Sequence, residues 1–96
     1  MASVQLVSRG DGVWGIEGRL TFATTPAFVQ AFAAVTEDAV IDLKQVELAD
    51  SAGLALLVEW AIQAEKKGLT MSFSNIPIQV LAMARVSGLD EILPMS

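Results

Sequence analysis

The stretch from residue 50 to residue 67, DSAGLALLVEWAIQAEKK, constrains the fold more than any other part of the chain. It opens with the polar turn Asp50-Ser51-Ala52-Gly53 and then carries apolar residues at the spacing of an amphipathic helix. An apolar strand precedes it, and Gly68 closes it. The stretch therefore predicts a strand, a tight turn and a helix, with the Ser51 hydroxyl at the turn, and we expect the function to lie there.

This helix has two sides. The side predicted to face the core is formed by four apolar residues at positions that stack along a helix: Leu54, Leu57, Val58 and Ala61. The opposite side is polar. Leu56 and Trp60, four residues apart, fall at the border of the polar side. We expect the core to leave them uncovered and available to a partner.

The rest of the chain predicts further strands and helices around this unit. Strands are expected at residues 3–8, 13–18, 39–43 and 69–73, the first two forming a hairpin around Gly10-Asp11-Gly12. A helix is expected at 26–36, capped by Thr24 and Thr25, and a last helix is expected between a cap at Ser74 or Asn75 and Gly88. Because strand, helix and strand alternate in its second half, the chain predicts an α/β fold. We expect a mixed sheet of about four strands, with about three helices mainly on one face.

Composition narrows the class of protein. Residues 1–96 fit a single domain, and the 53% apolar and 18% charged content excludes a disordered chain. No apolar run approaches the ~20 residues that span a bilayer, and the first residues do not resemble a secretory signal. We therefore expect no direct membrane insertion and a cytoplasmic location.

The charged and reactive residues exclude several functions. The net charge is −5 with six basic residues in all, so neither nucleic acid nor an anionic membrane is an expected ligand. The chain has no Cys and no His, which removes thiolate chemistry and the commonest general base and metal ligand. We expect no enzyme, no cofactor and no metal. The high apolar content of so short a chain instead predicts a protein partner.

Asp50 and Ser51 support two interpretations. In the first, their side-chain oxygens cap the helix, and Gly53 lets the turn pack closely. In the second, Ser51 is also a phosphorylation site, where a phosphoryl group at the positive end of the helix dipole changes the binding surface without unfolding the helix. A catalytic serine is disfavoured, because there is no G-x-S-x-G elbow and no His. Asp42, Glu47 and Asp50 have no regular metal-ligand spacing, and we expect them to form a solvated loop.

Several segments together resemble the STAS domain, the fold of the anti-sigma factor antagonists. They are Ile41-Asp42-Leu43, Asp50-Ser51-Ala52-Gly53-Leu54, Ser87-Gly88-Leu89 and Gly18-Arg19-Leu20-Thr21, and they extend over nearly the whole chain. In that family a partner kinase phosphorylates the serine that corresponds to Ser51. The chain departs from the family at Ala52, where many antagonists carry a second serine.

Within this family, the helix GLALLVEWAIQAEKKG and the ending Ile92-Leu93-Pro94 are similar to the small STAS subunits of phospholipid ABC transporters in Gram-negative bacteria. The resemblance implies a non-catalytic subunit that binds the ATPase at the inner membrane and serves outer-membrane lipid asymmetry. The alternative is an anti-sigma factor antagonist, whose partner is an anti-sigma factor kinase that modifies Ser51. The residues expected at the partner surface are Asp50, Ser51, Ala52, Leu56 and Trp60.

Overall fold

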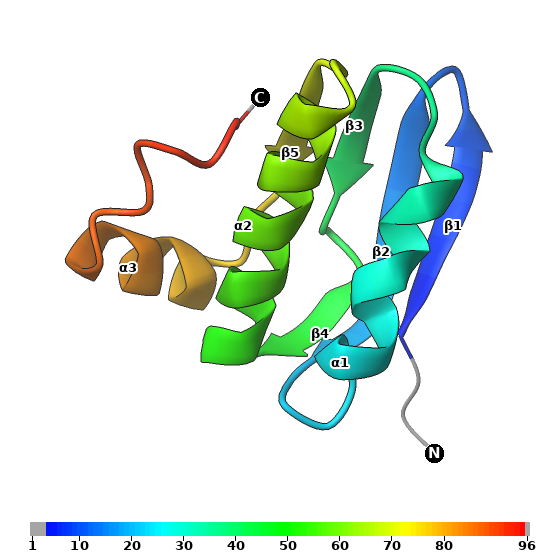
Figure 1. Cartoon of the computed structure of the whole chain (residues 1–96). Helices are drawn as coiled ribbons and strands as arrows, with labels where there is room; N and C mark the ends of the chain where they lie inside the picture. Colours follow the sequence, from blue (N-terminus) through cyan, green and yellow to red (C-terminus); the bar gives the residue numbers. More distant parts are fainter. Residues whose placement is uncertain (1–3, 96) are drawn as a thin grey trace.

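The computed structural model describes residues 4–95 and has the predicted mixture of strands and helices (Figure 1). Its elements, in chain order, are β1 (Gln5–Gly10), β2 (Val13–Leu20), α1 (Thr25–Phe28), the 3₁₀ helix η1 (Val29–Ala34), β3 (Ala39–Asp42), β4 (Val46–Ala49), α2 (Ser51–Lys66), β5 (Met71–Ser74) and α3 (Ile78–Val86). Residue 3, at the start of the predicted first strand, lies outside the described residues.

The strands form the predicted mixed sheet. Its order is β1-β2-β3-β5, with β1 antiparallel to β2 and both other pairs parallel. The β3-α2-β5 connection thus joins two adjacent parallel strands, as a helical crossover requires. Figure 1 shows α1 and α2 side by side across one face of the sheet, with α3 beside α2. The prediction of an α/β fold with helices mainly on one face is confirmed.

The sheet has one strand more than the sequence predicted. Residues Val46–Ala49, which we expected to be part of a loop, form β4 and pair in parallel with Gly18–Leu20 at the far end of β2. Only four residues long, β4 has an exposed centre at Glu47 and Leu48, so it lacks the apolar alternation of a buried strand. Its partner lies almost thirty residues earlier in the chain, and local sequence does not report such a pairing.

The predicted helix at 26–36 is divided. It is a single α-helical turn, α1, followed by the 3₁₀ helix η1. Pro26 lies in the first turn as predicted, but Thr24 makes no cap hydrogen bond; its hydroxyl donates to the carbonyl of Arg19 instead. Phe28 and Phe32 are buried in the core.

Two glycines end their helices as predicted. Gly68 and Gly88 have positive φ angles of 70° and 71°, which glycine adopts without steric cost. In each case the next residue closes the helix: the Leu69 N–H donates to Ala64 (2.9 Å) and the Leu89 N–H to Ala84 (2.8 Å). The predicted start of the last helix is wrong, because α3 begins after Pro77, with no side-chain cap.

Asn75 and Asp42 belong to a polar network at the ends of β3 and β5. The Asp42 carboxylate accepts hydrogen bonds from Asn75 Nδ2 (2.9 Å), the Lys44 N–H (2.9 Å) and Arg9 Nη1 (2.8 Å). The pKa of Asp42 is held below its usual value, mainly by the hydrogen bond from Asn75. The hydrogen bonds from Lys44 and Arg9 lower this pKa further. Asp42 is therefore an ionised structural residue that ties β1 to the far edge of the sheet.

We expect Leu57→Ala to destabilise the fold without altering any exposed surface. Leu57 is completely buried on the sheet-facing side of α2. Removing three side-chain carbons there leaves a cavity, which costs about 2 to 5 kcal/mol. Urea denaturation followed by circular dichroism measures the change. A loss below about 1 kcal/mol would show that Leu57 does not lie in a closely packed core.

Candidate functional site

The site is built on Asp50, which fixes the start of α2 to the end of β2. Asp50 Oδ1 accepts the N–H of Ala52 (2.8 Å), which is the predicted N-cap. Its other oxygen, Oδ2, accepts the N–H of Phe22 (3.2 Å), and its own N–H donates to the carbonyl of Leu20 (3.1 Å). One residue thus caps the helix and orients the loop that follows β2.

Gly53 is the second local requirement, because it lets α2 approach β2 closely. A Cβ at position 53 would lie 3.0 Å from both the Cβ and the carbonyl oxygen of Leu20, and 3.3 Å from the Cβ of Ala49. Backbone atoms cannot move aside cheaply, so a larger residue would push the helix away from the sheet. The Asp50-Ser51-Ala52-Gly53 turn therefore allows the start of α2 to pack closely against β2, as predicted from Gly53.

Ser51 is the first residue of α2, and it is exposed. Two shallow grooves meet at its side chain, one towards α1 and the other towards α3. Since the helix begins at Ser51, its free N–H groups and the positive end of its dipole lie beside the hydroxyl. The exposed Ser51 hydroxyl is thus a polar group between two apolar grooves.

The first groove lies between α1 and α2 and has a volume of about 570 Å³. It is lined by Phe22, Thr25, Pro26, Val29, Ser51, Ala52, Ala55, Leu56 and Glu59. Phe22 leaves 72% of its surface exposed beside it. The floor and walls are mainly carbon, which suits an apolar side chain of a partner.

The second groove lies between α2 and α3 and has a volume of about 380 Å³. It is lined by Ser51, Leu54, Ala82, Met83, Val86 and Ser87. Val86 is 91% exposed. Together with Ile78, also exposed, Ala82 and Val86 form a row at every fourth residue along the outer side of α3.

The prediction that the core leaves Leu56 and Trp60 uncovered is wrong. They are 2% and 0% exposed, because α1 and η1 pack over that side of α2. The Trp60 ring lies 5.2 Å from the ring of Phe28 and 5.4 Å from that of Phe32, and its Nε1 donates to the carbonyl of Val29 (3.2 Å). Trp60 is a core residue, whereas Leu56 forms part of the floor of the first groove.

Lys67, at the C-terminal end of α2, also contacts the η1 segment. Lys67 is exposed, but its Nζ donates to the carbonyl of Val35 and lies 5.1 Å from the centre of the Phe32 ring. The lysine therefore joins the end of α2 to the end of η1.

Sequence reasoning missed Phe22 and Val86. An available signal for Val86 was its spacing from Ile78 and Ala82, because these three residues share a helix face other than that of the buried Val80 and Ala84. Phe22 gave a weaker signal, as an aromatic residue in the turn after β2. Both are apolar residues that stay exposed among residues 4–95.

The described residues show no constellation for metal chemistry. Within residues 4–95, no group of three His, Cys, Asp or Glu side chains is placed to hold a metal ion. Asp42 and Asp50, which we had considered together with Glu47, are engaged in separate networks. No helix in the same residues is long and apolar enough to cross a membrane.

Comparison with known families and structures agrees with this architecture. The family model described as "Mlab, STAS domain" matches residues 7–94. The chain therefore belongs to the STAS domain family, which confirms the resemblance seen in its motifs. STAS is a regulatory and generally non-catalytic fold. A search of curated proteins gave no match.

Solved structures share this fold at low identity. An anti-sigma-factor antagonist (STAS) domain protein from Planctomyces limnophilus aligns with a TM-score of 0.72 and 19% identity, over 98% of this chain and 89% of that one. A sulfate transporter family protein from Wolinella succinogenes gives 0.65 and 18%, over 93% and 75%. The murine Solute Carrier 26 family member A9 anion transporter gives 0.62 and 21% over 94% of this chain, which spans only 18% of the transporter's length.

We expect Asp50→Ala and Ser51→Ala to differ in stability. Asp50→Ala removes the N-cap and the hydrogen bond to the Phe22 N–H, so it should cost about 1 to 2 kcal/mol. Ser51→Ala should stay within about 0.5 kcal/mol, because its side chain is exposed and has no hydrogen bond among those found in residues 4–95. Chemical denaturation of both variants tests the assignment. Equal losses would contradict it.

Proposed function

We propose that this chain is the STAS subunit of an ABC transporter that moves phospholipid between the inner and outer membranes. In this role it binds the transporter's ATPase subunit and stabilises or activates it, without catalysis of its own. It would lie in the cytoplasm, held at the inner membrane by its partner, and would serve the lipid asymmetry of the outer membrane. The match to the family model described as "Mlab, STAS domain" supports this proposal.

The observation that carries the proposal is the surface around Ser51. Ser51 lies between two apolar grooves, with exposed Phe22 and Val86 at their edges. Apolar grooves that stay exposed on a domain surface are typical of protein–protein contacts. The proposed contact consists of Asp50, Ser51 and Ala52 with the two grooves; Leu56 takes part only as a floor residue.

Charge on this surface should break the complex with the ATPase. Ser51→Glu and Val86→Asp each place a carboxylate where the partner's apolar side chains would exclude water, and we expect each to weaken binding about tenfold or more. Both should fold normally, because Ser51 lies at the positive end of α2 and Val86 is exposed. The complex is measured by co-expression with the ATPase, size exclusion at micromolar concentration and calorimetry.

Ser8→Glu is the matched control, since Ser8 is an exposed serine on β1, at the opposite edge of the sheet from α3. Its complex should elute like that of the wild type. If the wild-type chain and the ATPase elute separately, or if Ser8→Glu disrupts the complex as much as Ser51→Glu does, the proposal is wrong.

A second candidate is a phosphorylation switch of the anti-sigma factor antagonist type. It is favoured by the exposure of Ser51 at the first turn of a sixteen-residue helix and by the fold shared with the Planctomyces limnophilus antagonist domain protein. Incubation with the cognate kinase and ATP should add 80 Da on Ser51, as one phosphoryl group does. Mass spectrometry of the wild type and of Ser51→Ala reads this out. A chain that stays unmodified under turnover conditions excludes the switch.

A further inference from the structure

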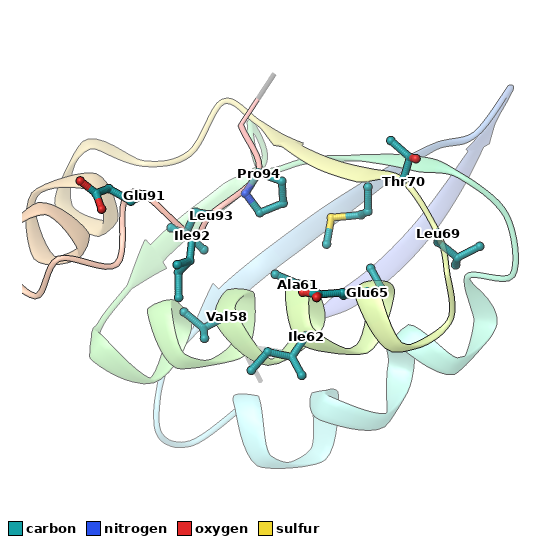
Figure 2. A pocket seen from close by; sticks show the side chains of 12 residues that line it. Val58, Ala61, Ile62, Glu65, Leu69, Thr70, Glu91, Ile92, Leu93 and Pro94 are labelled. Atoms are coloured by element: carbon teal, nitrogen blue, oxygen red, sulfur yellow. The ribbon is translucent and has the colours of Figure 1, made fainter.

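A third groove lies on the other side of α2, away from Ser51. It has a volume of about 560 Å³ and runs between the C-terminal half of α2, the start of β5 and the segment 91–94 (Figure 2). None of the residues lining it lines either groove beside Ser51. Its α2 residue Glu65 lies about 21 Å along the helix from Ser51. A ligand here would occupy a second, separate surface.

One wall of this groove is the outer edge of β5, which is paired at Phe73 but not at Met71. The carbonyls of Thr70, just before β5, and of Ser74, its last residue, accept hydrogen bonds from the N–H groups of Ala39 and Leu43, so these carbonyls point towards β3. Backbone groups alternate along a strand, so those of Met71 and Phe73 point the other way. At Phe73 the chain's own C-terminal segment already pairs there, because the Phe73 N–H donates to the carbonyl of Pro94 (2.7 Å).

The C-terminal segment pairs with β5 at Phe73 but not at Met71. Within residues 4–95, β5 has β3 as its partner strand on one side and only the single bridge at Phe73 on the other. Met71 lines this groove and is 5% exposed, and its outward N–H and C=O have no hydrogen-bond partner among residues 4–95. An extended segment lying in this groove would continue the pairing that the C-terminal segment begins.

The other lining residues of the groove indicate which side chains a bound peptide segment should carry. Ile62 and Ile92 are 41% and 55% exposed at the groove, which favours apolar side chains. Glu65 and Glu91 are its only charged lining residues, and no ion pair engages either of them among the described residues. Figure 2 shows Glu65 on α2 and Glu91 on the C-terminal segment. Lys or Arg on the ligand would complement this pair of carboxylates.

We propose that this groove binds an extended peptide segment of a partner protein, which adds to the open edge of β5 at Met71. The segment carries apolar side chains that enter the groove, and Lys or Arg side chains that meet Glu65 and Glu91. The strand edge provides affinity through main-chain hydrogen bonds, and the two carboxylates select a basic sequence. The site does not depend on the ATPase surface at Ser51.

The test uses the full chain and a displayed library of random nine-residue peptides. Selection should enrich peptides that combine apolar residues with Lys or Arg. The double variant Glu65→Lys with Glu91→Lys should bind the enriched peptides about tenfold or more weakly, because it replaces two attractions with two repulsions. The matched control is Glu37→Lys with Glu47→Lys, which makes the same change of net charge at exposed residues outside the groove. It should bind as the wild type does.

A backbone measurement separates strand addition from simple charge attraction. In an NMR titration with an enriched peptide, the amide of Met71 should shift and its hydrogen exchange should slow, while the amides of Ser51 and Ala52 stay unchanged. The proposal is overturned if no peptide is enriched, if the enriched peptides are acidic, if the control variant loses as much binding, or if Met71 does not respond. Self-association of the chain through this groove, without peptide enrichment, would assign it to a second copy and also overturn the proposal.

Discussion

The contact between the start of α2 and the end of β2 determines most of this structure. Asp50 caps α2 through Ala52, receives the N–H of Phe22 and donates its own N–H to Leu20. Gly53 makes the contact possible, because any Cβ there would meet Leu20. A helix held so closely at its first turn has a fixed direction across the sheet. The same hydrogen bonds hold the loop after β2, so the scaffold and the surface beside Ser51 are positioned together.

The helix then separates three surfaces of different chemistry. Its buried side carries Leu57 and Trp60, which join the sheet and η1 into one core. Its first turn exposes Ser51 between two apolar grooves, and its last turns border the acidic groove that contains Glu65. A domain this small cannot bury all of its apolar residues, and exposed Phe22 and Val86 line the two grooves beside Ser51.

The sequence predicted those features that depend on neighbours along the chain. The core positions Leu54 and Leu57, the Asp50 cap and the glycine ends of two helices are all encoded within a few residues, and the structure has them. Features that depend on distant segments were missed. Trp60 looks exposed until η1 covers it, and β4 does not look like a strand until β2 pairs with it. The two grooves that Phe22 and Val86 line likewise form only when α1, α2 and α3 are brought together.

We propose that a protein partner covers the surface around Ser51. Hydroxyl-radical footprinting tests it directly, because side-chain oxidation reports solvent access residue by residue. In the complex with the ATPase, oxidation of Phe22, Met83 and Val86 should fall strongly, while that of the exposed Met95 should be unchanged. Unchanged oxidation of Phe22 and Val86, with protection confined to Met95 or to β1, would contradict it.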